Sequence, residues 1–137
     1  MKAIEQRLID NKIKPTAMRL LVFEFLLGQS SAQSLTDMEL KMDRTDRVTL
    51  YRTIRTFEEN GLVHRIEDGS GITKFALCDP GCDVDGHHDL HLHFYCIECK
   101  ETHCLPKTKI PEVKLPVGYK PTETQLIVKG ICRNCGS

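Results

Sequence analysis

Two Cys-x-x-Cys pairs constrain this chain more than any other feature of its sequence. Cys96 and Cys99 form the first pair, and Cys132 and Cys135 form the second, close to the last residue. Two thiolates from one tight turn can bind the same ion, and two such turns complete the tetrahedral shell of a structural zinc. We therefore expect these four cysteines to hold one zinc ion. The alternatives are a thioredoxin-like redox pair, which needs only one such motif, and unconnected buried thiols.

Zinc would also explain how a small second domain folds. The 137 residues leave room for one compact domain or two very small ones. A structural zinc contributes about 10–16 kcal/mol of apparent binding free energy in small peptides, which is comparable with the stability of a whole domain. Alternating apolar residues predict strands over 91–97, 101–105 and 123–130. The prolines between the last two strands exclude a long helix there: Pro106, Pro111, Pro116 and Pro121.

Helical patterns dominate the first half of the chain. A weakly amphipathic helix is expected over 2–11, and a second one is expected from Lys14-Pro15-Thr16 to Gly28, with Pro15 in its first turn. After a loop at 28–34, a short helix is expected over 35–42. A longer helix, capped by Thr45 or Asp43, should run to about Asn60.

A predicted β-hairpin follows the helices. The run 62–66 has strand character, Asp68-Gly69-Ser70-Gly71 is a strong turn, and 72–77 can return as the second strand. Helices followed by a hairpin are the order of a winged helix-turn-helix. The fold class is therefore α+β, with a winged helix at 1–77, a hinge and ligand loop at 78–90, and a zinc-stapled, mostly β dimerisation domain at 91–137.

The formal net charge of zero gives no hint of a nucleic-acid partner, but the charge distribution does. Three arginines and no acid lie between residues 47 and 57. On the predicted fourth helix, one face is apolar (Leu50, Ile54, Phe57) and another carries Arg47, Tyr51 and Arg55. In an arbitrary protein such a polar face is usually just solvated. In a winged helix it is the face that can enter a DNA groove.

Composition also bounds the compartment. Residues 1–30 contain no apolar run of membrane-spanning length, and the first predicted helix carries charges that a secretory signal lacks. We expect a cytoplasmic protein with no membrane partner. Cytosolic thiols stay reduced, so the seven cysteines should bind metal or sense redox state instead of forming disulfides.

Taken together, these segments resemble the ferric uptake regulator family of bacterial metal-responsive repressors over nearly the full length. The resemblance rests on Lys14-Pro15-Thr16-Ala17-Met18-Arg19, Val48-Thr49-Leu50-Tyr51-Arg52-Thr53-Ile54, Gly61-Leu62-Val63, His91-x-His93-x-x-Cys96-x-x-Cys99 and Cys132-x-x-Cys135. It implies that Tyr51 and Arg52 contact the DNA backbone and bases, and that Lys14 reaches a neighbouring groove. The remaining candidate DNA contacts are Arg19, Arg47, Thr49 and Arg55.

The resemblance also implies a second, regulatory metal site. His91 and His93 match the family's regulatory histidines, and Cys104 takes the place of a usual carboxylate. The family's histidine after the second helix is absent, and Ala76 stands where an acid is usual. Cys78 could then supply the missing ligand, with His87, His88 or Cys82 as substitutes. Thiolate and imidazole together suit zinc better than iron(II).

A blander interpretation stays open for this histidine-rich region. The residues could be solvated loop histidines and small buried cysteines, and His64 and His103 individually look more like surface residues than ligands.

The sequence thus predicts a metal-dependent repressor of metal-uptake genes that responds to zinc and binds double-stranded DNA. We expect a homodimer that forms through an exposed sheet edge and takes no small-molecule substrate. One alternative is an iron- or peroxide-responsive regulator on the same fold, with Fe²⁺ in the second site. The other is a zinc-dependent enzyme, for which the sequence lacks the H-E-x-x-H and deaminase motifs.

Overall fold

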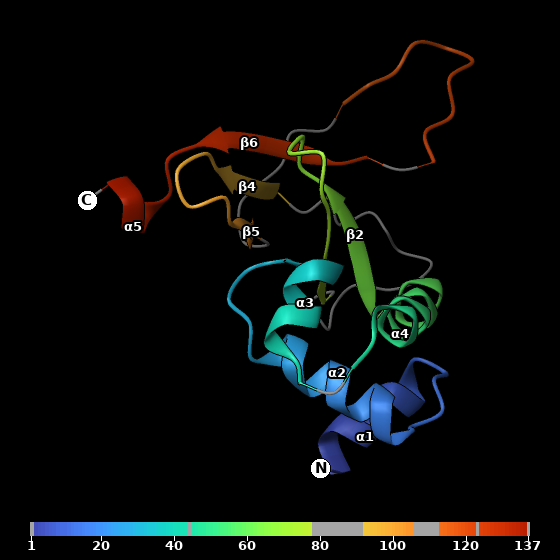
Figure 1. Ribbon diagram of the computed structural model, residues 1–137. Coiled ribbons are helices and arrows are strands. Elements are labelled where there is room, and N and C mark those ends of the chain that lie inside the picture. The colour runs from blue at the N-terminus through green and yellow to red at the C-terminus, as the bar shows by residue number, and fades with distance from the viewer. Residues whose placement is uncertain (1, 44, 78–91, 106–112, 123, 137) are drawn as a thin grey trace.

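The computed structural model describes residues 2–43, 45–77, 92–105, 113–122 and 124–136. The chain has three parts: helices at the amino-terminal end, a hairpin that rises from them, and a second small sheet beyond the hairpin (Figure 1). The chain is α+β, in the predicted order of a winged helix followed by a mostly β domain. Within the described residues, every helix is too short or too polar to cross a bilayer.

The four amino-terminal helices lie close to their predicted ranges. They are α1 (Lys2–Asp10), α2 (Ala17–Leu27), α3 (Leu35–Lys41) and α4 (Arg47–Glu59). Helix α4 ends at Asn60, and Gly61 takes a positive φ of 74°, a backbone conformation that glycine adopts without steric cost.

Two of the predicted helix starts are corrected by the capping hydrogen bonds. Thr16 Oγ1 accepts from the Arg19 backbone N–H at 3.3 Å, so Pro15 precedes α2 instead of lying in its first turn. Asp46, and neither Thr45 nor Asp43, caps α4, because its carboxylate accepts from the Thr49 N–H at 2.7 Å. Several capping residue types occur close together in both places, so sequence alone did not single out the cap.

The hairpin belongs to a three-stranded antiparallel sheet, which we call the wing sheet. Its strands are β1 (Gln33–Ser34), β2 (Val63–Glu67) and β3 (Thr73–Leu77), in the order β1-β3-β2. Strand β1 lies in a segment predicted as a loop. Two residues are too few for a periodic pattern, and only their pairing with Phe75 and Lys74 makes them a strand.

The main core lies between the helices and one face of the wing sheet. The predicted apolar face of α4 is buried there, where Leu50, Ile54 and Phe57 are at most 1% exposed. The Phe57 ring meets Phe23 of α2 edge to face at 6.5 Å, and Phe75 of β3 packs on the same cluster. This core buries the apolar face of α4 and leaves its polar face outward.

The second sheet contains β4 (Leu92–Cys96), β5 (Thr102–Leu105) and β6 (Leu126–Gly130) in the order β5-β4-β6. Strand β4 pairs antiparallel with β5 and parallel with β6. Strand β6 begins at Leu126, later than the predicted residue 123. A short helix, α5 (Arg133–Gly136), follows it and was not predicted.

The two sheets face each other. Strand alternation and the β2–β3 register put His64, Ile66 and Lys74 on the face of the wing sheet away from the helices. Lys74 Nζ lies 5.0 Å from the centre of the Tyr95 ring on β4, and the His64 and His93 rings lie 5.2 Å apart. The wing sheet is therefore the middle layer between the helices and the second sheet (Figure 1).

Candidate metal centres and nucleic-acid interface

The two Cys-x-x-Cys pairs meet at one end of the second sheet. The Sγ atoms of Cys96, Cys99, Cys132 and Cys135 all lie within 4.8 Å of one another. The Sγ atoms of Cys99 and Cys132 are 3.9 Å apart. Sulfurs about 2.3 Å from a zinc ion at the corners of a tetrahedron are about 3.8 Å apart. The spacing of the thiols therefore fits a tetrathiolate zinc.

Local backbone structure positions these sulfurs. Cys96 ends β4, and the turn after it closes through a 2.9 Å bond from the Lys100 N–H to the Cys96 carbonyl, with Lys100 at a positive φ of 66°. Cys132 follows β6, and Cys135 lies in α5. The parallel pairing of β4 with β6 places the carboxyl ends of both strands side by side, so the two turns meet.

Electrostatics at these thiols also favours a cation. Backbone N–H groups of Cys99 and Cys132 point at Cys96 Sγ, at 3.5 Å and 3.4 Å, and lower the pKa of Cys96 to about 6. At the other extreme, the neighbouring Cys132 raises the pKa of Cys135 to about 12. Four thiolates cannot share this space unless a positive ion offsets their mutual repulsion.

A second cluster lies between the two sheets. It consists of His64 from β2, His93 from β4 and Cys104 from β5, whose ligand atoms lie within 4.8 Å of one another. Register explains why two of them meet, since His93 and Cys104 are directly paired and therefore share one face of the sheet. His64 lies on the face of the wing sheet that is turned toward the second sheet, and its ring meets the His93 ring there.

The cluster has the dimensions of a metal site. The Nε2 atoms of His64 and His93 are 3.4 Å apart, and nitrogens bound to a tetrahedral zinc are about 3.3 Å apart. His93 is buried, and His64 and Cys104 are half-buried. Three protein ligands leave one tetrahedral position for a further ligand.

His64 is the residue that sequence reasoning missed, since it was regarded as a surface histidine. The available signal was alternation. His64 stands two residues before Ile66 in the predicted strand, so both should point to the same face, and Ile66 is fully buried without belonging to the core under the helices. A buried face away from that core implies a second layer, and His64 points into it.

The other predicted ligands of the regulatory site fall in one segment of the chain. Cys78, Cys82, His87, His88 and His91 lie outside the described residues. His103 is described and lies on the opposite face of β5 from Cys104, where its ring contacts the Ser30 carbonyl at 3.2 Å and the Glu101 carboxylate at 3.4 Å. It is therefore not part of the cluster.

Helix α4 presents the predicted polar face to solvent. Arg47, Tyr51, Arg52 and Arg55 are all exposed. Arg47 pairs with Glu39 at 3.7 Å and Arg55 pairs with Glu59 at 3.0 Å. No ion pair of Arg52 occurs in the part of the chain that the structure describes. Arg52 is therefore the arginine of this face whose charge is most available to a partner.

The remaining candidate DNA contacts lie around the start of α2 and of α4. Lys14 is exposed, and its carbonyl accepts a 2.9 Å bond from Arg19 Nη1, which fixes the arginine against the turn before α2. Thr49 is half-buried, and its backbone N–H is used by the Asp46 cap.

Comparison with known proteins matches nearly the whole chain. A family model, described as the ferric uptake regulator family, matches residues 10–129. The peroxide operon regulator of Bacillus subtilis (strain 168) is 22% identical over 143 residues, which cover 98% of this chain and 92% of that regulator.

Solved structures match over a similar extent. The ferric uptake regulator of Vibrio cholerae matches with a TM-score of 0.63 at 22% identity, covering 93% of this chain and 98% of that one. A zinc uptake regulator complexed with zinc and DNA matches with a TM-score of 0.69 at 18% identity, covering 98% and 91%. At these identities the structural matches show a common fold.

Proposed function

The chain belongs to the ferric uptake regulator family, whose members are metal-responsive transcription regulators and not enzymes. From this premise we propose that it is a zinc-responsive DNA-binding repressor of metal-uptake genes. The observation that carries the proposal is the His64, His93 and Cys104 cluster between the two sheets. Two imidazoles and a thiolate form a soft ligand set, which binds zinc well, whereas iron(II) prefers harder ligands.

A structural zinc at Cys96, Cys99, Cys132 and Cys135 is the second part of the proposal. The solved zinc uptake regulator that shares this fold contains zinc. The sulfur spacing here fits such an ion, and its role would be to join the two turns that close the second sheet. We keep the division into 1–77, 78–90 and 91–137 as the corresponding domain proposal.

Metal at the second cluster would act by a population shift. The cluster draws ligands from the wing sheet and from the second sheet, so a metal ion bound there favours one orientation of α4 relative to the second sheet. In a dimer, that orientation decides whether both α4 helices reach successive major grooves. The affinity for DNA would then follow metal occupancy, and the protein would act in the cytoplasm, where bacterial DNA lies.

We propose a homodimer, and the segment 113–122 supports it. Four alternating apolar side chains in this segment are exposed: Val113, Leu115, Val117 and Tyr119. The segment projects from the body beside β6 (Figure 1), and its tip is a turn in which the Tyr119 N–H donates to the Pro116 carbonyl at 3.2 Å. Apolar groups on an ordered projection indicate a protein partner, and a second copy also offers the free edge of β6.

Breaking this surface should weaken the dimer. We expect Val117→Asp with Tyr119→Ser to raise the dimer dissociation constant by at least about tenfold, because both changes remove apolar area at the tip. Sedimentation equilibrium measures the constant. The double variant Lys114→Gln with Lys120→Gln alters neighbouring exposed residues and should leave it unchanged. A dimer of wild-type strength in the first variant would exclude this segment from the interface.

DNA binding by α4 has a direct test. The probe is a palindromic duplex selected from a random library with the zinc-loaded protein. Arg52→Ala should weaken binding to it by about 10- to 100-fold, because an arginine contact to a base or phosphate is lost. Fluorescence anisotropy at fixed salt measures the affinity. Arg133→Ala removes an exposed arginine from α5 instead and serves as the charge-matched control. Equal affinities of the two variants would remove α4 from the DNA interface.

A further inference from the structure

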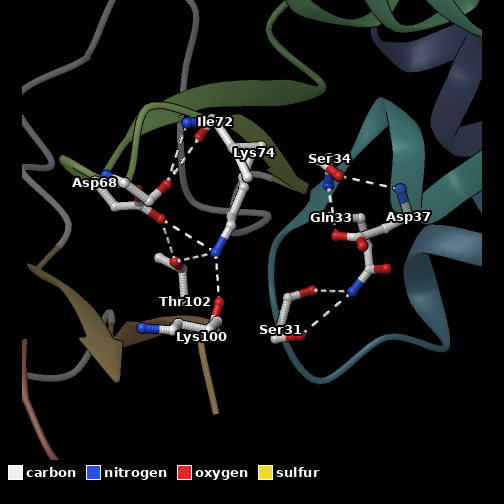
Figure 2. A network of polar contacts seen from close by, with 10 residues as sticks. Ser31, Gln33, Ser34, Asp37, Asp68, Ile72, Lys74, Lys100 and Thr102 are labelled. Carbon is white, nitrogen blue, oxygen red and sulfur yellow. Dashed lines mark hydrogen bonds and ion pairs between the residues drawn. The ribbon is translucent and has the colours of Figure 1, made fainter. Parts of the chain in front are cut away.

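A buried ionic network joins the wing to the second sheet, beside the metal cluster but separate from it. Figure 2 shows it: Asp68 and Lys74 from the wing hairpin meet Thr102 and the Lys100 carbonyl from the second sheet. The Lys74 and Asp68 side chains are 7% and 0% exposed, and Thr102 is fully buried. We call Asp68, Lys74 and Thr102 the latch residues.

All three protons of the Lys74 ammonium group have acceptors. Nζ lies 2.8 Å from the Lys100 carbonyl, 2.9 Å from Thr102 Oγ1 and 3.2 Å from Asp68 Oδ2. Thr102 in turn donates its hydroxyl proton to Asp68 Oδ2. Burial raises the pKa of Asp68, but hydrogen bonds from Ser70 and Thr102 outweigh it and lower the pKa to about 2. Asp68 is therefore ionised, and both side chains have hydrogen-bond partners on all sides.

Such a network fixes geometry in a way that apolar packing does not. Hydrogen bonds offset the desolvation cost of the two buried charges, and they do so only while they stay short. Small displacements between the sheets therefore raise the free energy. Thr102 is also tied through its backbone, because its carbonyl accepts from the Ala32 N–H just before β1 at 2.8 Å. Thr102 thus holds the wing sheet at both the hairpin and the β1 end.

The latch and the metal cluster hold the same interface. Strand alternation places Thr102 and Cys104 on one face of β5, and Lys74 and His64 on one face of the wing sheet. A wing that is held in place by the latch already presents His64 to His93 and Cys104. Without these contacts, the wing would first have to return to this position before metal could bind. The free energy needed for that reordering would lower the affinity for the metal.

We propose that Asp68, Lys74 and Thr102 are positioning residues that pre-assemble the regulatory metal site, so that metal affinity depends on side chains that do not touch the metal. The inference rests on the proposed function, because it assigns the latch a role at the His64, His93 and Cys104 site. By linkage, the latch and the metal then favour the same orientation of the wing.

Thr102→Val tests this with zinc alone as the probe. The change keeps the shape of the side chain and removes the hydroxyl group. In full-length protein already carrying one zinc per chain, the dissociation constant of the second zinc, measured by competition with a chromophoric chelator, should rise about tenfold. The first zinc should be retained. Thr102→Ser keeps the hydroxyl and should bind the second zinc within about twofold of wild type.

Two further variants make the test specific. Thr53→Val removes another buried hydroxyl, which bonds to the Thr49 carbonyl within α4 at 2.9 Å, and should leave zinc affinity unchanged. Lys74→Met with Asp68→Asn removes the ion pair without leaving a buried charge, and should reproduce the loss seen in Thr102→Val. It provides the test if the valine variant fails to fold.

Amide hydrogen exchange gives a second readout. The Ala32 N–H, which is protected by the Thr102 carbonyl, should exchange faster in Thr102→Val without the second zinc and recover when zinc is added, since zinc closes the same interface. Wild-type affinity for the second zinc in both Thr102→Val and the Lys74→Met, Asp68→Asn variant would refute the proposed role of the latch residues. It would not contradict the regulatory site itself. A wild-type protein that binds one zinc only would refute the regulatory site, and the proposed coupling with it.

Discussion

Replacing Cys135 by Ser is expected to release the zinc at the Cys-x-x-Cys pairs and to unfold the second sheet. The sheet has three strands of four or five residues, and buried apolar side chains are few there compared with the core under the helices. The variant would lose most of an apparent zinc-binding free energy of about 10–16 kcal/mol. That free energy exceeds the folding stability that side-chain packing in so small a sheet can supply. The amino-terminal helices, with their own core, should persist.

Native mass spectrometry and amide hydrogen exchange measure these two effects. The zinc content should fall, and protection should be lost in β4 and β6 while α2 and α4 stay protected. Cys104→Ser is the matched comparison, because it also replaces a cysteine of the second sheet but lies outside the four-sulfur cluster: it should lose only the second zinc, keep the first, and leave β4 and β6 protected. A Cys135→Ser protein with its zinc and its β6 protection intact would contradict the proposed site.

His64→Ala is expected to abolish the response of DNA binding to zinc without unfolding the protein. Loss of residues that merely orient metal ligands already lowers metal affinity by about 10- to 100-fold, so loss of a ligand should lower it at least as much. The affinity of the second zinc should therefore drop by at least about 100-fold. The chelator competition assay measures that affinity, and anisotropy with the labelled duplex measures the DNA response.

The matched control is His103→Ala. His103 lies one residue from Cys104 but on the opposite face of β5, so its loss should change neither quantity beyond about twofold. If both histidine variants lose the second zinc equally, the loss is not specific to the His64, His93 and Cys104 cluster, and a site between the two sheets is contradicted.

Local patterns in the sequence were sufficient for most of the fold. The apolar spacing of Leu50, Ile54 and Phe57 predicted both α4 and the face that it buries, and the order of helices and hairpin predicted the winged helix. These features depend on periodicity within a few turns, which a single sequence carries. The exact caps did not follow, because Asp43, Thr45 and Asp46 are all capable of the role.

The contacts between the sheets could not be predicted in the same way. His64 and His93 come from different sheets, and nothing near either residue indicates the other. The same holds for Lys74 and Thr102, whose types usually lie at the surface and are buried here only because each satisfies the other. Long-range packing decides such pairs, and the two-residue strand β1 was missed for the same reason.

The proteins similar to this chain include a ferric uptake regulator, a zinc uptake regulator and a peroxide operon regulator, so similarity alone does not select the sensed signal. One titration distinguishes among these signals. Protein that carries only its structural zinc is mixed with the selected duplex, and the affinity for the duplex is measured as the free concentration of zinc, iron(II) or manganese(II) is increased. The same measurements are repeated after treatment with peroxide. We expect zinc to raise the affinity at the lowest free concentration, and peroxide to have no effect on the zinc-loaded protein. An affinity that does not change with zinc, or that responds to iron(II) and is lost with peroxide, would contradict a zinc-responsive regulator.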